Sequence, residues 1–581
     1  MLPSILVTLL LALVISCVGQ SLHLRTAGGT LRWIGQEPVA YCFNTLLVWA
    51  WLLLWLAVTG NAVIACWVGG LIALVLAYVD YLCGVNREKP LLPRDFAMVL
   101  NLNLLAKMIS VASVVLLVGG VAAAVALCLL LDWLVNAPFL PGLFRLVLGL
   151  LSALVLALFA TLALPRNPLR KLLNKLGVKF DDYRIDIFGS FDRFGFFLAF
   201  FQLLLAPMMP EPKGYSPEAV EELTHRYPAA SPAGRRASRP NVVLIMSEAF
   251  SDPTRLAGVR FDSDPIPYIR GLMEQTPSGQ VLTPGYGGGT AHCECEVLTG
   301  LSTALCGDNS PYENRIAQWG RDSFPSLAGR MAANGYRTVA LHPYTDDMYA
   351  RPKAYRAMGF QDFIIHTGMT HRDKPDNSPY ISDAAAYAET LDILNKGPDG
   401  AFVHLVTMQN HGDYRAGRFH NSIKAEGMPD SHRQMMETYA QGLRYTDEAT
   451  KACLEQLRML DRETVVLFWG DHLPFGYPQT FYREDRLGSY LTPFFLWSSG
   501  ERFEAERLGI RSPIFLGRQL LRGLEMPSTA FDGILDRLEE RFHGIHMDFT
   551  LDSREEQLPT LKAMEDEVFR DYMIAQYDLL H

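Results

Sequence analysis

Charge is missing from four long stretches of this 581-residue chain. No Asp, Glu, Lys or Arg occurs in residues 1–22, 38–79, 108–131 or 146–165. A helix needs about 20 apolar residues to cross a bilayer. The second stretch is long enough for two crossings, at roughly 42–58 and 62–80. We therefore predict an α-helical membrane domain of five spans.

Three further absences limit the class of protein. The apolar run at 1–22 has no Lys or Arg before it and no clear small-x-small cleavage site, which favours a retained span over a cleaved signal peptide. None of the nine cysteines forms a CxxC pair, so a structural zinc knuckle is not expected, while a disulfide such as Cys295–Cys306 remains open. A net charge of −9 and the lack of a basic patch in the second half argue against nucleic acid as a partner.

Composition divides the chain into four segments. Residues 1–165 are the predicted transmembrane domain, and residues 166–239 a juxtamembrane segment and linker. Within this segment, the apolar run at 194–209 is short for a span and favours an interfacial helix. Residues 240–545 are a predicted soluble domain, and residues 546–581 a charged, helical C-terminal tail.

Basic residues gather in the loop at 86–96 and directly after residue 165. With five spans, both regions lie on the same side of the membrane as the soluble domain, and the positive-inside tendency places that side in the cytoplasm. If residues 194–209 crossed the bilayer, the soluble domain would emerge outside. The charge pattern alone leaves both topologies open.

Short apolar runs alternate with helical segments in residues 240–545. Four of these runs have the composition of strands buried on both faces of a sheet. They are residues 242–246, 337–342, 401–408 and 464–470. The alternation predicts an α/β domain with a mostly parallel central sheet, in which ligands gather at the carboxyl ends of the strands.

Each of the four runs leads into polar side chains. The first is followed by Glu248, the second ends at His342, and the third leads to His411. The fourth leads to Asp471 and His472. Because the carboxyl ends of parallel strands meet at one edge of a sheet, we expect these side chains to converge. The two carboxylates and the imidazole of His472 suit a divalent cation such as Mn²⁺, Zn²⁺ or Mg²⁺.

Thr290 follows three consecutive glycines, Gly287 to Gly289. Glycines allow a strained turn and the close approach of a bulky ligand. A threonine hydroxyl is a poor nucleophile at neutral pH, and coordination to a dication would stabilise its alkoxide. Each residue alone has an ordinary structural interpretation, such as a turn or capping residue. Together they predict a metal-activated threonine nucleophile.

Several motifs in order resemble one enzyme family. GYGGGTAHCECEVLTG (285–300) is similar to the nucleophile region of the lipoteichoic acid synthase family, which are phosphoglycerol transferases of the alkaline phosphatase and sulfatase superfamily. TMQNHGDY (407–414), WGDHLPFG (469–476) and HPYTDDMYAR (342–351) resemble three further motifs of this family. NREKPLLPRDF (86–96) resembles its loop between membrane spans. The resemblance implies an alkaline phosphatase-like fold for the soluble domain.

The resemblance also implies roles for individual residues. The metal ligands fall on Glu248, Thr290, Asp471 and His472, with Thr290 as the nucleophile and manganese as the usual ion. The matches for binding the phosphoglycerol group are Arg351 and His411. Tyr349 stands where a tryptophan is common in the family, which bears on head-group or acceptor packing. The role of His342 remains open, because it could bind substrate or belong to the core.

The implied reaction is a double displacement. Thr290 attacks the phosphorus of a phosphatidylglycerol-like lipid and diacylglycerol leaves. A hydroxyl of an envelope glycan or glycolipid then takes the glycerophosphate from Thr290. His411 would hydrogen-bond the phosphoryl group or protonate the leaving alkoxide. In this family the catalytic domain faces outward from a bacterial cell membrane, which favours the extracytoplasmic topology.

Other functions remain open at this point. A phosphoethanolamine transferase also combines five spans with a threonine nucleophile and a metal. A catalytically inactive membrane scaffold or sensor would keep the fold but would not need the four predicted ligands. A formylglycine sulfatase needs a C/S-x-P-x-R pattern, which the cysteines near the glycine loop do not have. The sequence does not identify the acceptor or the oligomeric state.

Overall fold

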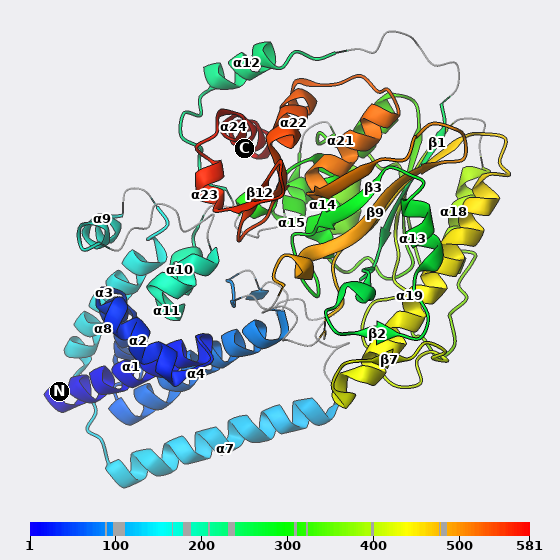
Figure 1. Ribbon diagram of the computed structural model, residues 1–581. Helices are drawn as coiled ribbons and strands as arrows, with labels where there is room; N and C mark the ends of the chain where they lie inside the picture. Colours follow the sequence, from blue (N-terminus) through cyan, green and yellow to red (C-terminus); the bar gives the residue numbers. More distant parts are fainter. Residues whose placement is uncertain are drawn as a thin grey trace. The chain divides into compact units, whose positions relative to one another are not determined.

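The computed structural model divides into two compact units, Met1–Met208 and Met209–His581 (Figure 1). It describes residues 1–87, 90–93, 95–96, 111–164, 167–177, 187–206, 209–230, 239–306, 311–320, 323–396, 400–475, 477 and 485–581. Lys89 and Arg94, which contribute to the predicted basic loop, lie outside these residues.

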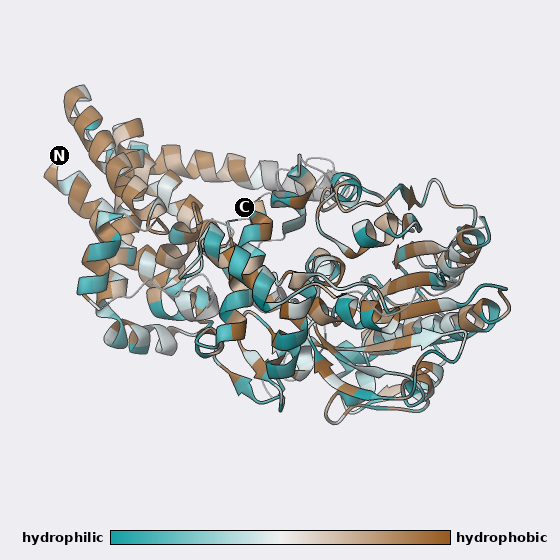
Figure 2. Ribbon diagram, turned by 90° about the horizontal axis from the view of Figure 1, so that it is seen from above, coloured by the Kyte–Doolittle hydropathy of each residue, from teal (hydrophilic) through white to brown (hydrophobic). Residues whose placement is uncertain are grey.

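The first unit is entirely helical in its described part. Its helices are α1 (Leu2–His23), α2 (Ala27–Gln36), α3 (Pro38–Thr59), α4 (Ala62–Arg87), α7 (Val111–Val135), α8 (Gly142–Ala160), α9 (Pro168–Lys175), α10 (Ile187–Phe194) and α11 (Phe196–Leu203). Four of them hold segments long and apolar enough to cross a membrane: Leu2–His23, Pro38–Thr59, Ala62–Val85 and Gly142–Ala160. Figure 2 shows hydrophobic residues along most of their length.

The fifth predicted span, residues 108–131, corresponds to α7. Residues 108–110 lie outside the described residues, and the described apolar part, Gly119–Val135, is shorter than a full crossing. Four spans are therefore supported by length and composition, and the fifth stays a prediction. Within the run at 194–209, residues Phe196–Leu203 form α11, and the side chains from Phe196 to Phe200 are buried. Its placement at a membrane interface also stays a prediction.

The second unit is built on an eight-stranded sheet with the order β10-β3-β9-β8-β1-β6-β4-β5. The strands are β1 (Asn241–Ser247), β3 (Ser278–Leu282), β4 (Arg337–His342), β5 (Asp362–Ile365), β6 (Ala401–Val406), β8 (Thr464–Gly470), β9 (Leu491–Ser498) and β10 (Arg507–Arg511). The four strands predicted from sequence are the adjacent set β8-β1-β6-β4, and they pair in parallel. β9 pairs antiparallel with β8 and β3, so the sheet is mostly parallel, as predicted.

Helices cover both faces of this sheet, which explains why its central strands are apolar throughout. Val243 and Val403 belong to the core shared with α13 (Pro267–Met273), α18 (Asp383–Leu394) and α19 (Asp430–Leu457). Successive side chains of a strand point to opposite faces. The next pair along the ladder, Leu244 and His404, therefore faces the layer of α14 (Thr290–Thr299), α16 (Leu327–Ala333) and α21 (Pro513–Gly523). The His404 imidazole contacts Glu294 of α14 on that face.

The remaining elements of this unit are α12 (Pro217–Arg226), β2 (Arg260–Phe261), α15 (Pro311–Asn314), α17 (Arg351–Ala357), β7 (Ala425–Glu426), α22 (Ala530–Arg541), β11 (Phe542–Ile545), β12 (Thr550–Asp552), β13 (Gln557–Leu558), α23 (Thr560–Ala563) and α24 (Glu567–Leu580), with four short 3₁₀ turns. Residues 546–581, predicted as a helical tail, thus contain two short strands as well as two helices.

The helix α24 packs into the unit and holds the turn that follows α14. The Tyr572 hydroxyl donates to the Gly300 carbonyl (2.8 Å). The Gln576 side chain accepts from the Ser302 amide (2.7 Å) and donates to the Ser302 carbonyl (2.9 Å). Both side chains are fully buried. The turn after α14 is therefore held by residues 272 and 274 positions away in the sequence.

Candidate functional site

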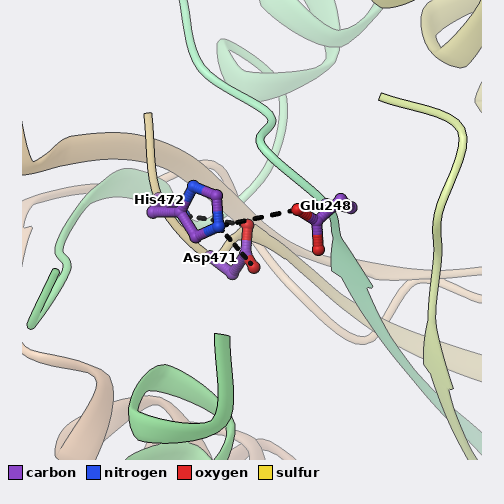
Figure 3. Close-up of side chains that lie close together, drawn as sticks. All are labelled: Glu248, Asp471 and His472. Atoms are coloured by element: carbon purple, nitrogen blue, oxygen red, sulfur yellow. Dashed lines mark hydrogen bonds and ion pairs between the residues drawn. The ribbon is translucent and has the colours of Figure 1, made fainter. Parts of the chain in front are cut away.

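The parallel register brings the predicted metal ligands together. Ser247 of β1 lies opposite Gly470 of β8, so the residues that follow them, Glu248 and Asp471, leave the sheet side by side. All three residues Glu248, Asp471 and His472 are buried, and one ligand atom from each lies within 4.8 Å of the others (Figure 3). The convergence expected from the strand ends is therefore present for Glu248, Asp471 and His472.

Hydrogen bonds orient this acid–imidazole group. The Asp471 Oδ1 accepts from the backbone amides of Ala249 (2.8 Å) and His472 (2.9 Å). The His472 Nδ1 donates to the Leu473 carbonyl (2.8 Å), which leaves the lone pair of Nε2 facing the group. That Nε2 lies 3.5 Å from Glu248 Oε1 and 3.4 Å from Asp471 Oδ2.

The group has the properties of a divalent cation site. Asp471 Oδ2 is buried and has no hydrogen-bond partner among the described residues. Burial, and then the nearby Asp471 carboxylate, raise the pKa of Glu248 to about 8. Two buried carboxylates facing one another without a cation repel. Two carboxylates and an Nε2 lone pair are a donor set for Mn²⁺, Mg²⁺ or Zn²⁺, so these residues fit the predicted ion.

Thr290 stands beside this group as the first residue of α14. Its hydroxyl lies 3.4 Å from His472 Nε2. The preceding glycines Gly287, Gly288 and Gly289 all have positive φ (60°, 155° and 99°), so the turn depends on residues without a side chain. The start of a helix also carries partial positive charge, which favours an anionic phosphoryl group at this position.

A second buried cluster includes Arg351, which was predicted, and three residues that were not predicted from the sequence, Glu294, Tyr355 and His404. Glu294, one helical turn after Thr290, accepts from Arg351 Nη2 (3.1 Å) and Nε (3.3 Å). It also contacts His404 Nε2 (2.9 Å) and accepts from the Tyr355 hydroxyl. Burial alone would raise the pKa of Glu294, but Arg351 and these hydrogen bonds lower it to about 2. Glu294 is therefore ionised and fixes the guanidinium of Arg351.

Tyr349 lies on the loop after β4, and His342 is the last residue of that strand. Tyr349 has a positive φ of 61°, which is uncommon for a residue with a side chain, and its ring lies 5.2 Å from the Arg351 guanidinium carbon. His342 is buried and its Nδ1 donates to the Val406 carbonyl (3.0 Å). Burial lowers the pKa of His342 to about 3, so its imidazole is neutral and Nε2 can accept a hydrogen bond.

His411 is exposed on the loop after β6, and Arg418 holds that loop in place. The buried Arg418 guanidinium donates to the carbonyls of His411 (2.7 Å) and Asp413 (2.7 Å), and also to that of Gln409. Partial burial lowers the pKa of His411 below its usual value. Nothing in the spacing of the sequence pointed to Arg418, because its partners are backbone atoms.

An S-x-P-x-R pattern does occur away from the cysteines, at residues 251–255. The Ser251 hydroxyl is buried and lies 2.9 Å from the Tyr439 hydroxyl and 2.8 Å from that of Tyr477. Ser251 therefore closes the turn after β1 and does not restore a formylglycine function. Cys293, Cys295 and Cys306 are buried, and the structure joins none of the three in a disulfide.

Glu296 gives a pH prediction for this helix. Burial raises the pKa of Glu296 to about 8 from its ordinary 4.5, and its Oε1 accepts from the Thr303 amide (2.7 Å) and hydroxyl (2.8 Å). The pKa of Glu296 is higher in the folded state than in the unfolded state. Its contribution to the unfolding free energy is therefore complete below the unfolded-state pKa and is lost as pH rises to about 8. Glu296→Gln cannot ionise and keeps the acceptor. Between about pH 5 and pH 8.5, the unfolding free energy of the wild type should therefore fall by about 2–4 kcal/mol more than that of Glu296→Gln.

Urea unfolding followed by pulse proteolysis at both pH values measures this difference. Because Glu248 and all other groups titrate alike in both proteins, the comparison isolates Glu296. Equal pH dependence in the two proteins would show that Glu296 is ionised in the folded state.

Comparison with known proteins agrees with this geometry. Residues 240–525 match the family model described as sulfatase. A putative cyclic beta-1,2-glucan modification protein of Rhizobium meliloti is 31% identical over 410 residues, covering 66% of this chain and 61% of the relative. The lipoteichoic acid synthase of Staphylococcus saprophyticus is 24% identical over 196 residues, covering 33% of this chain and 28% of the relative. The chain thus spans less than two thirds of the length of these relatives.

The Streptococcus pyogenes phosphoglycerol transferase GacH, solved in complex with sn-glycerol-1-phosphate, has a similar fold. Its TM-score is 0.54 at 24% identity, covering 64% of this chain and 95% of GacH. Residues 240–525 therefore form a sulfatase domain of the alkaline phosphatase superfamily, and lipoteichoic acid synthases are among the homologues of the chain.

Proposed function

We propose that this protein is a membrane-anchored phosphoglycerol transferase that moves glycerophosphate from a phosphatidylglycerol-like lipid to an envelope glycan or glycolipid. The observation that carries the proposal is the Thr290 hydroxyl, 3.4 Å from His472 Nε2 and beside two buried carboxylates. The names of the similar proteins, a glucan modification protein and lipoteichoic acid synthases, support a glycan or lipid-linked acceptor.

The proposed reaction has two displacements. In the first, the Thr290 oxygen bonds to phosphorus, the bond from phosphorus to the diacylglycerol oxygen breaks, and the threonine proton ends on diacylglycerol. In the second, an acceptor hydroxyl bonds to phosphorus, the bond to Thr290 breaks, and the acceptor proton returns to the Thr290 oxygen. A divalent ion bound by Glu248, Asp471 and His472 would supply positive charge to the nucleophile and the phosphoryl oxygens.

The surrounding residues orient the substrate. Arg351, held in place by Glu294, neutralises phosphoryl charge. Neutral His342 accepts a hydrogen bond from a glycerol hydroxyl, and Tyr349 packs against the head group. His411, on the loop after β6, carries the proton between the leaving and attacking oxygens. The catalytic unit works outside the cytoplasm, anchored in a bacterial cell membrane.

The donor can be identified with labelled lipids. We expect the full-length protein in detergent with Mn²⁺ to transfer label from phosphatidylglycerol labelled in its head-group glycerol, and to carry a glycerophosphate mass on Thr290. Phosphatidylethanolamine labelled in its head group serves as the matched donor. Label from ethanolamine would instead identify a phosphoethanolamine transferase, and no transfer from either lipid would favour an inactive scaffold.

Metal removal should both inactivate and destabilise the protein. Without a cation, two buried carboxylates face one another, so we expect chelation to abolish transfer and lower the melting temperature. Re-addition of Mn²⁺ at about 100 times its dissociation constant should restore about 2.7 kcal/mol of stability. Thermal melts with Mn²⁺, Mg²⁺ and Zn²⁺ rank the ions. Asp471→Asn is the control, and a melt that Mn²⁺ shifts equally in this variant would place the ion elsewhere.

A further inference from the structure

Exposed aromatic side chains are concentrated at one place in the second unit. Among its described residues, the large apolar side chains that are exposed are Tyr344 (37%), Met459 (85%) and Phe475 (45%). Met459 follows the end of α19. Tyr344 lies two residues after His342, beyond the end of β4. Phe475 lies three residues after His472, beyond the end of β8. Exposed aromatic rings beside a reactive group indicate a binding surface.

Phe475 lies between two loops of the site. A Cβ atom added to Gly412 would lie 2.0 Å from Phe475 Cε1, and one added to Gly287 would lie 3.1 Å from Phe475 Cβ. The ring therefore occupies space that a side chain at Gly412 would fill. Its backbone lies against the glycine turn that leads to Thr290. This position places one exposed ring between the loop of His411 and the turn that leads to Thr290.

Tyr344 continues the same surface on the other side of His411. Its ring centroid lies 5.8 Å from that of Tyr380, which lies 5.4 Å from the His411 ring. The Tyr380 hydroxyl donates to the Gly412 carbonyl (3.0 Å), and Gly412 contacts Phe475. Tyr344, Tyr380, His411 and Phe475 thus form a continuous row, which we call the aromatic rim.

We propose that the aromatic rim binds the acceptor as a sugar, with pyranose rings stacked on Tyr344 and Phe475 and a sugar hydroxyl directed toward Thr290. This inference rests on the proposed function and specifies its acceptor. A pyranose ring has apolar C–H faces and polar hydroxyl edges. The rim likewise alternates apolar and polar groups, because the polar His411 imidazole and Tyr380 hydroxyl lie between the two exposed rings.

A lipid chain or bilayer surface fits the rim less well. Such a partner would need a contiguous apolar patch, and the two exposed rings are separated by His411 and Tyr380. The hydroxyl of the stacked sugar is the nucleophile of the second displacement. Its oxygen bonds to phosphorus, the phosphorus bond to Thr290 breaks, and the sugar proton ends on the Thr290 oxygen. The rim therefore determines which acceptor is used, and the donor step does not depend on it.

Ring-removing and ring-keeping substitutions test this role. Tyr344→Leu and Phe475→Leu keep apolar bulk but remove the ring, whereas Tyr344→Phe and Phe475→Tyr keep it. With phosphatidylglycerol as donor and a neutral glucose oligosaccharide as acceptor, we expect each leucine variant to raise the acceptor KM about tenfold. The donor KM should change less. The ring-keeping variants should stay within about twofold of the wild type, and Met459→Leu serves as the exposed control.

The outcomes separate this inference from the proposed function. A wild type that transfers to the oligosaccharide, with leucine variants of unchanged acceptor KM, overturns the sugar-binding role. A raised donor KM with an unchanged acceptor KM shows that the rings contact lipid instead. A wild type that does not use phosphatidylglycerol at all overturns the proposed function.

A second measurement covers variants that fail to fold. Saturation-transfer NMR on the wild type should show the sugar C–H protons receiving saturation from protein aromatic protons. Saturation confined to the hydroxyl-bearing edge, or absent altogether, contradicts stacking.

Discussion

Thr290→Ala should lower the release of diacylglycerol from phosphatidylglycerol by at least about a thousandfold. The alanine variant lacks the oxygen that bonds to phosphorus, and the described residues place no other hydroxyl within hydrogen-bond distance of His472 Nε2. Thr290 is small and begins a helix, so its loss should change the unfolding free energy by about 1 kcal/mol or less. Diacylglycerol release, measured with the purified full-length protein, checks the effect.

Thr290→Ser is the matched control, because it keeps the hydroxyl and removes only a methyl group. We expect it to retain measurable transfer and the covalent glycerophosphate adduct. If the alanine variant transferred glycerophosphate at a rate close to that of serine, water or another side chain would be the nucleophile, and the double displacement would be wrong.

Glu294→Gln should have the largest effect on stability. The carboxylate is fully buried and ion-paired with Arg351, which is itself 2% exposed. Neutralising one partner leaves an uncompensated buried charge, which typically costs 3–5 kcal/mol. The guanidinium would also lose its fixed orientation, so transfer should fall as well. Melting temperature and kcat, measured on the same preparation, check both effects.

Two controls separate stability from catalysis in this cluster. Glu296→Gln, two residues along the same helix, replaces a carboxyl whose raised pKa keeps it neutral, so it should be tolerated near neutral pH. The double variant Glu294→Gln with Arg351→Met removes both charges and should regain stability without regaining transfer. Recovery of transfer in the double variant would show that Arg351 does not bind the phosphoryl group.

The strand ends were predictable because a parallel sheet turns sequence position into spatial position. Apolar runs identify the strands, and their parallel pairing places Glu248, Asp471 and His472 at one edge. The glycines before Thr290 were equally informative, because three successive positive φ angles require residues without a side chain. The number of spans was less certain, because hydropathy identifies apolar helices but does not place them in a bilayer.

The supporting residues could not be predicted from one sequence. Glu294, Tyr355 and His404 come from a helix, a second helix and a strand, and only the fold shows that they meet. Arg418 contacts backbone carbonyls, and every residue has one, so this contact does not depend on a particular residue type at a particular spacing. Ion pairs and loop supports of this kind depend on long-range packing, whereas the predicted ligands depend on strand register.

The contacts of α24 have a consequence for the order in which this protein matures. Tyr572 and Gln576 hold the turn at Gly300 and Ser302, directly after the nucleophile helix. During synthesis, α14 leaves the ribosome long before these two side chains exist. Helix α14 therefore remains without this support until α24 has been made and has docked, and a nonsense mutation before Tyr572 would produce a chain in which the Thr290 helix never receives it.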